Sequence, residues 1–252
     1  KGMFGLHASM TISDKTLYKC LDLIADLNTG FHVHTGEGIE DAEDCMRKYG
    51  KGIVERWYDA GVLCDKTIAV HCIYIKEKEM DLLKEKNTIV VHNPESNMGN
   101  AVGVAPILKM YKKGILLGLG TDGYTSDMME SYKVANIIHK HVKGDSTVAW
   151  NEIPNMLFNN NKTITERFIE GKVGILKEGA LADIIIVDYN PPTPINENNI
   201  NSHLLFGING RFVDTTIING RVVMENRKLV GIDEERIMAK SRELASKVWK
   251  RF

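Results

Sequence analysis

The sequence predicts an α/β fold in which the strands of a parallel sheet alternate with helices. Apolar runs of strand length lie at 31–35, 67–75, 88–92 and 115–119, and segments of helical character separate them. Strands that alternate with helices are typical of parallel sheets. Each run also leads into a polar, ligand-capable residue. Because a (β/α)8 barrel carries its active site at the carboxyl ends of its strands, this pattern predicts a barrel.

Helical patterns account for most of the chain between these strands. Ser13 has the side chain of an N-cap, and apolar residues recur at helical spacing after it, as far as about Leu27. The polar segment 93–99 is expected to be a loop. Further helices are expected at about 41–60, 76–86, 104–113 and 127–142.

After about residue 170 the pattern changes to short strands. They are expected within 174–188, 204–210 and 215–230, where Asn219-Gly220 is a strong hairpin turn. From Asp233 onward, apolar residues at near-helical spacing predict a C-terminal helix packed on the rest. The expected parts are a barrel at 1–170, a small β unit at 171–230 and a C-terminal helix at 231–252.

Composition excludes several classes of function. The chain has 32 basic and 33 acidic residues and a formal charge of −1, so it shows no sign of a surface for nucleic acid or for an anionic membrane. A small-molecule substrate fits better. The four cysteines form no CxxC pair, which argues against a zinc–thiolate site and suits a reducing compartment. No apolar run approaches the ~20 residues of a membrane helix, and no leader is apparent. We expect a cytoplasmic protein.

Four candidate site residues lie at or just after the ends of apolar runs. They are His34, His71, His92 and Asp122. A single histidine in such a place is more often structural, but four polar endings in register favour a shared site. Asp122 could also belong to an ordinary Asp-Gly turn, although the apolar run before it favours a carboxylate ligand at the end of a strand.

The segment HVHTGE at 32–37 is the most informative. The neutral imidazole of His34 can bind a metal, and the carboxylate of Glu37, three residues on, can reach a water held by that metal. His32 shares its strand face with His34, so either could point inward, and the position of His34 nearer the strand end favours it.

For the polar stretch after the third apolar run, the sequence leaves two interpretations open. His92, Asn93 and Asn97 belong to a stretch that either lines a pocket or forms a solvated loop. His139 and His141 are expected on the surface of a helix, and His203 in a surface loop.

Taken together, the motifs GLHASMTISDKTL, HVHTGE, AVHC, VVHNPESNMG and GLGTDGYTSD resemble those of the amidohydrolase superfamily. The resemblance is to its deaminase and chlorohydrolase branch, and it covers nearly the whole chain. It implies barrel strands four to eight, followed by a β-sandwich segment. In that family an HxH pair after the first strand also binds the metal. No such pair precedes the fifth-strand motif here, so the chain resembles the C-terminal portion of a longer enzyme.

The resemblance implies a role for each candidate. His34 and Asp122 would bind one divalent metal, with zinc favoured and iron or manganese open. Glu37 would transfer protons, His71 would polarise the attacked centre, and Asp122 would also accept a hydrogen bond from the attacking water. The residues implied in substrate binding are His7, His92, Asn93 and Asn97.

The implied reaction is hydrolysis of a non-peptide C–N bond, most simply the deamination of an aminated N-heterocycle. Dechlorination or acyclic amide hydrolysis by the same residues is the alternative, and so is a non-catalytic remnant that lacks the first metal motif. The chain alone is expected to be inactive. Unpaired strand edges would permit association, for example as a homodimer.

Overall fold

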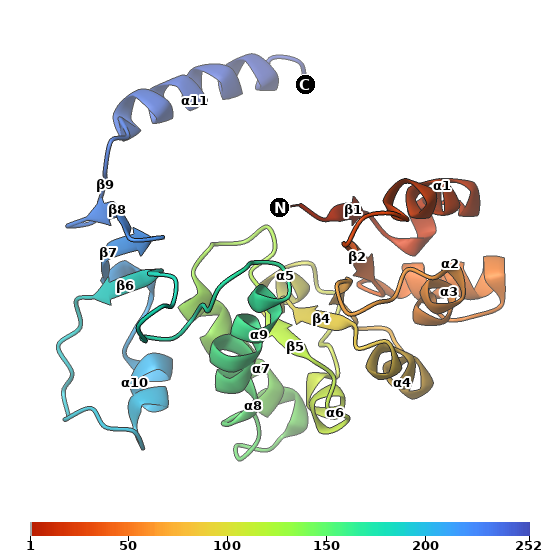
Figure 1. The fold of residues 1–252 in the computed structure, drawn as a ribbon, viewed down its shortest axis with the longest axis horizontal. Coiled ribbons are helices and arrows are strands. Elements are labelled where there is room, and N and C mark those ends of the chain that lie inside the picture. Colours follow the sequence, from red (N-terminus) through yellow and green to blue (C-terminus); the bar gives the residue numbers. More distant parts are fainter. Residues whose placement is uncertain (1) are drawn as a thin grey trace.

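The computed structural model describes residues 2–252 and contains two sheets (Figure 1). The first is parallel, and its five strands are hydrogen-bonded in the order of the chain, as are successive strands of a (β/α)8 barrel. In Figure 1 they follow an arc, with helices along its outer side. This is part of such a barrel. The strands are β1 (Phe4–Leu6), β2 (Phe31–Thr35), β3 (Ile68–His71), β4 (Ile89–His92) and β5 (Leu117–Leu119).

The helices between these strands largely follow the prediction. Ser13 caps α1 as expected, because its side chain accepts a hydrogen bond from the backbone N–H of Thr16. The predicted helix at 41–60 is two helices, since the chain turns through a left-handed Gly50. The bounds are α1 (Asp14–Ile24), α2 (Ile39–Tyr49), α3 (Ile53–Ala60), α4 (Glu77–Glu85), α6 (Ile107–Lys112) and α7 (Met128–Lys143).

Two predictions about this part were wrong in detail. The segment expected to be a loop after β4 begins a short helix, α5 (Pro94–Gly99), with proline at its first position, where no N–H is needed. The run at 67–75 stops being a strand at His71, where the backbone turns left-handed. The short helical segments η1 (Ser9–Thr11), α8 (Glu152–Pro154), η2 (Asn155–Asn160) and α9 (Asn161–Glu166) complete this part.

Strand β2 shows why one face of the sheet carries the core and the other the candidate site. Its side chains alternate, and Phe31, Val33 and Thr35 are buried on one face. The buried core includes Phe31 and Val33, together with Trp57 of α3. His34 lies on the opposite face of the strand and is partly exposed. The helix-covered face therefore supplies the packing and holds that histidine in place.

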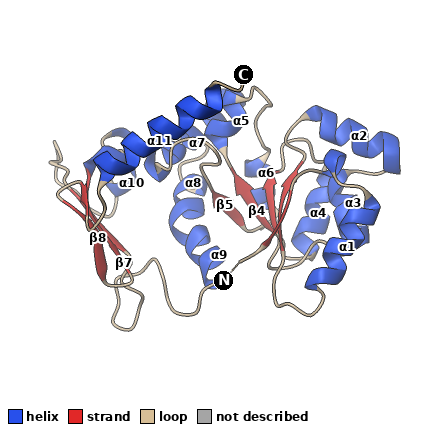
Figure 2. Cartoon of the chain, turned by 90° about the horizontal axis from the view of Figure 1, so that it is seen from above, coloured by secondary structure: helices blue, strands red, loops and turns tan. Residues whose placement is uncertain are grey.

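The second sheet is antiparallel, and Figure 2 shows it apart from the first. The predicted hairpin is confirmed, because Asn219 and Gly220 adopt φ values of 49° and 75°. The short strand expected at 204–210 was wrong, since most of that segment belongs to a helix and a 3-10 turn. The elements are β6 (Ile184–Val187), α10 (Ile200–Phe206), η3 (Gly210–Phe212), β7 (Val213–Ile218), β8 (Arg221–Glu225) and β9 (Lys228–Leu229).

The C-terminal helix, α11 (Glu234–Trp249), forms as predicted but does not pack as predicted. None of its residues, all of which are described, is buried, and its apolar side chains Ile237, Leu244 and Val248 are exposed. In Figure 1 it lies apart from the parallel sheet. Helical spacing predicted the helix but could not identify a surface for it to contact.

The boundaries between the three expected parts of the chain, near residues 170 and 230, stay predictions. None of the helices found within residues 2–252 has the length and apolar character of a membrane-spanning segment.

Candidate active site

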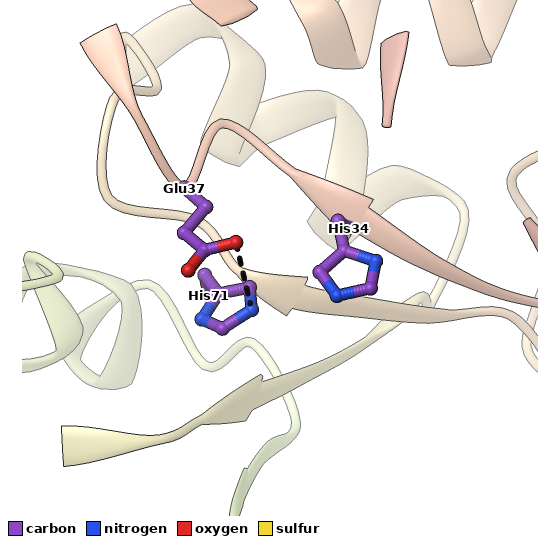
Figure 3. Close-up of side chains that lie close together, drawn as sticks. All are labelled: His34, Glu37 and His71. Atoms are coloured by element: carbon purple, nitrogen blue, oxygen red, sulfur yellow. Dashed lines mark ion pairs between the residues drawn. The ribbon is translucent and has the colours of Figure 1, made fainter. Parts of the chain in front are cut away.

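Four predicted residues at or just after the carboxyl ends of β2, β3 and β5 come together. Figure 3 shows His34, at the end of β2, Glu37, in the loop that follows, and His71, the last residue of β3. The rings of His34 and His71 are stacked, with centroids 5.4 Å apart. His71 Nε2 lies 3.5 Å from Glu37 Oε2 and 3.7 Å from Oδ2 of Asp122, which follows β5. We call these four residues the His–carboxylate cluster.

The backbone at the end of β3 is shaped to present His71. His71 and Cys72 have φ values of 71° and 52°, a left-handed conformation that costs non-glycine residues about 1–3 kcal/mol each. Hydrogen bonds to the neighbouring loop hold this bend, because the N–H groups of Cys72 and Tyr74 donate to the carbonyls of Thr35 and Gly36 at 2.9 Å. The same contacts fasten β3 to the loop that carries Glu37.

Asp122 also has a left-handed backbone, with φ of 55°, and its Oδ1 accepts a hydrogen bond of 2.7 Å from the N–H of Gly123. Partial burial raises the pKa of this carboxyl, but hydrogen bonds from Ser96 and Gly123, with His71 and His34 nearby, outweigh burial and hold the pKa below its ordinary value. Asp122 is therefore an anion at neutral pH, as a metal ligand must be.

The donor set of the cluster fits a divalent cation. His34, Glu37 and His71 each offer one ligand atom, and these atoms lie within 4.8 Å of one another. His71 Nε2 is buried and has no hydrogen-bond partner among the residues described, although two carboxylates lie nearby. Imidazole nitrogen and carboxylate oxygen suit zinc and several other first-row divalent ions. His34, rather than His32, is the β2 histidine in this cluster.

His7, predicted to bind substrate, extends the row of rings. Its ring centroid is 5.2 Å from that of His34, and its carbonyl accepts a 2.9 Å hydrogen bond from the backbone N–H of His34. His7 Nδ1 lies 2.8 Å from the Thr11 hydroxyl. The side chain is exposed beside the cluster, which keeps a substrate contact possible.

The other three predicted substrate residues are buried. His92 and Asn97 are each 1% exposed, and Asn93 is 3% exposed. His92 Nε2 lies 3.1 Å from His139 Nε2, and Asn97 Oδ1 lies 2.8 Å from His71 Nδ1. Two of these side chains thus contact other protein side chains, and a substrate role for all three stays a prediction.

His139 and His203, which were expected at the surface, are both buried, so that expectation was wrong. His139 faces inward from α7, and burial, aided by Lys143, lowers its pKa to about 4. Burial, with His139 beside it, also lowers the pKa of His92 well below the ordinary value. His203 contacts the hydroxyls of Tyr189 and Thr193. Polar partners make such burial possible, and the sequence does not show them. His141 is exposed, as expected.

Sequence reasoning missed two residues that hold the cluster. Asp41, buried in α2, accepts hydrogen bonds from the N–H groups of Met10 at 2.7 Å and Gly36 at 3.3 Å, which ties the loop after β1 to the loop of Glu37. Burial raises the pKa of Asp41. Asn100 donates from Nδ2 to Glu37 Oε1 at 3.2 Å. Asp41 at the start of a helix looks like an ordinary first-turn acid, and the Asn100 contact spans 63 residues.

Comparison with known proteins places the chain in a family. The model of the amidohydrolase family matches residues 1–223. The chain is 35% identical over 253 aligned residues to a 5-methylthioadenosine/S-adenosylhomocysteine deaminase of Dictyoglomus thermophilum, covering 99% of the chain and 59% of the relative. It is 33% identical to a 5'-deoxyadenosine deaminase of Methanopyrus kandleri, covering 97% and 57%. It thus spans just under three fifths of the length of these relatives.

Solved structures of similar fold include a deaminase and a chlorohydrolase. An adenosine deaminase from Xanthomonas campestris with bound zinc superimposes with a TM-score of 0.88 at 25% identity, covering 98% of this chain and 57% of that one. An atrazine chlorohydrolase, TrzN, from Arthrobacter aurescens complexed with zinc has a TM-score of 0.73 at 22% identity, covering 92% and 52%, which supports the fold alone. Because the family model matches residues 1–223, the chain belongs to the amidohydrolase family.

Proposed function

We propose that the protein containing this chain hydrolytically deaminates an aminated N-heterocycle, and that aminopurine nucleosides are its substrate class. The observation that carries the proposal is the His–carboxylate cluster, in which two imidazoles and two carboxylates meet at the ends of parallel strands. The relatives that are about a third identical and named as deaminases of adenosine derivatives support the choice of substrate.

His34 and Asp122 are the residues of this chain that would hold a divalent metal, and zinc is the ion named in the similar deaminase structure. When bound, such a cation lowers the pKa of water to about 7 and so supplies a nucleophile at neutral pH. The ionised state of Asp122 and the neutral nitrogen of an imidazole are the forms that bind metals.

Glu37 carries the proton. Its Oε1 is held by Asn100 and its Oε2 faces His71, so the carboxylate is fixed beside the place where water and substrate would meet. It takes a proton from the attacking water and delivers it to the amine, which leaves as ammonia while the ring gains an oxygen. His71 stabilises the charge that develops on the attacked centre.

Hydrolytic removal of chloride from a heterocycle is the second candidate, because the chain shares its fold with a zinc-containing atrazine chlorohydrolase. The same residues would serve, with chloride leaving in place of ammonia. Zinc as the ion, a cytoplasmic location and a homodimeric state also stay proposals.

The test uses the full-length protein with zinc supplied. Released ammonia and chloride are measured with each of several compounds: adenosine derivatives altered at the 5' position, guanine, cytosine, an aminotriazine and a chlorotriazine. We expect ammonia from the aminopurine nucleosides. An Asp122→Asn variant should lose this activity, whereas His141→Gln, a change at an exposed histidine outside the cluster, should retain it. Ammonia from none of the amines would refute the proposed function.

A further inference from the structure

A buried amide stands directly behind His71. We propose that Asn97 is a positioning residue whose Oδ1 accepts a hydrogen bond from Nδ1–H of His71, so that His71 presents Nε2 to the cluster. The inference rests on the proposed function for its catalytic meaning, although its structural claim can be tested without any substrate. It gives Asn97 a role other than the substrate contact that the sequence suggested.

The contact between the two side chains is short and shielded from solvent. Asn97 Oδ1 lies 2.8 Å from His71 Nδ1, and the two residues are 1% and 0% exposed. Asn97 Nδ2 is buried and has no partner among the residues described. The contact with His71 is therefore the amide's only hydrogen bond within that part of the chain. The oxygen of Asn97 is thereby engaged by His71 rather than left free for a substrate.

The backbone around Asn97 fixes where its amide lies. Its N–H donates to the carbonyl of Asn93 at 3.0 Å, and its carbonyl accepts from the N–H of Val102 at 3.1 Å. These two bonds hold the residue within α5 and the turn that follows it. With its backbone held in this way and its side chain buried, the amide is a fixed acceptor for the ring.

A fixed acceptor determines which ring nitrogen carries the proton. An amide oxygen facing Nδ1 forms a favourable bond only with Nδ1–H, and the hydrogen bond at one imidazole nitrogen sets the state of the other. Nε2 then faces Glu37 Oε2 at 3.5 Å and Asp122 Oδ2 at 3.7 Å. The proposal holds whether or not the ring gains a second proton, because Nδ1 is protonated in both cases.

Removing the acceptor should release the ring without changing substrate contacts. Loss of an outer hydrogen-bond partner in a metal site typically costs about 10–100-fold in activity. We therefore expect Asn97→Leu to lower kcat by about 10–100-fold with little change in KM. Asn97→Asp, which keeps an acceptor oxygen at the same position, should recover most of that loss.

A matched variant separates positioning from general destabilisation. Asn136 in α7 is also a buried asparagine, and its amide bonds the carbonyl of Ala149 and the ammonium of Lys140. Asn136→Leu removes a buried amide outside the cluster. It should lower the free energy of unfolding but leave the kcat of the folded protein near wild type.

The deciding measurement is nitrogen NMR of the zinc-loaded, full-length protein labelled with [15N]histidine, with the His71 signals identified by their loss in His71→Gln. We expect Nδ1 of His71 to be protonated in the wild type and in Asn97→Asp, and the proton to be redistributed in Asn97→Leu. An unprotonated Nδ1 in the wild type, or a His71 spectrum unchanged in Asn97→Leu, would overturn the proposal. A raised KM with unchanged kcat in Asn97→Leu would also overturn it, because that result would make Asn97 a substrate contact. If the wild type deaminated nothing, the proposed function would fail while the NMR result still decided the role of Asn97.

Discussion

We expect the buried pair of His92 and His139 to make the protein sensitive to acid. Their Nε2 atoms are 3.1 Å apart, so one ring donates and the other accepts while both are neutral. Burial lowers the pKa of His139 to about 4 and that of His92 well below its ordinary value, whereas an unfolded histidine titrates near 6.5. Protonation of either ring would place a charge in the core, and protonation of the accepting ring would also remove the lone pair that receives the hydrogen bond.

The size of the effect follows from these values. Between pH 6.5 and 4 the unfolded chain binds a proton at His139 that the folded chain excludes, so stability is lost as the pH falls through this interval. Each such proton changes the free energy of unfolding by about 1.4 kcal/mol per pH unit. Over roughly 2.5 units His139 alone accounts for about 3 kcal/mol, and His92 adds to it in the same direction.

Urea unfolding at pH values from 6.5 to 4 tests this in the wild type and in His139→Gln. Glutamine can still hydrogen-bond His92 but binds no proton, so the variant should lose about 3 kcal/mol less than the wild type over the interval. His141→Gln, a change at an exposed position in the same helix, should follow the wild type. Equal pH dependence in wild type and His139→Gln would show that the buried pair does not resist protonation.

Two further changes test the scaffold of the site. Arg56 is buried and donates hydrogen bonds to the carbonyls of Ser9 and Ile12, next to the loop of His7. Arg56→Leu should therefore lower the free energy of unfolding, measured by urea titration, by roughly 3 kcal/mol. A change below about 0.5 kcal/mol would contradict this. A Cβ on Gly30 would lie 2.3 Å from the carbonyl carbon of Lys66. Gly30→Ala should therefore destabilise the protein by about 1–3 kcal/mol, which thermal unfolding measures. An unchanged Tm would argue against the close approach of these two segments.

The sequence predicted the parts of this site that depend on local pattern. Apolar runs located β2 to β5, four strands of the five-stranded sheet, and the polar residues that end them predicted a shared site of His34, His71, His92 and Asp122. His34, His71 and Asp122 do meet in the cluster, whereas His92 contacts His139 instead. This works because parallel strands bring their carboxyl ends to one edge. Glu37 was predicted from its spacing, because it lies three residues after His34, where its carboxylate can reach a water held by the metal.

Contacts between distant segments could not be predicted in this way. Asn97 lies 26 residues from His71, and Asn100 lies 63 residues from Glu37. His139 sits among lysines in the sequence, which suggested a surface position, but its face of α7 packs inward against His92. Each of these polar groups can be buried because it has a partner, and a single sequence does not pair them.

The central claim is that Glu37 transfers protons at a metal site to which His34 contributes a ligand, and metal content measured beside turnover tests it most directly. In the full-length protein, Glu37→Gln should keep zinc at the wild-type ratio while kcat falls by about 10²–10⁴-fold, because glutamine cannot carry the proton. His34→Ala should lose zinc and activity together. Near-wild-type turnover in Glu37→Gln, or loss of its zinc as in His34→Ala, would contradict the account.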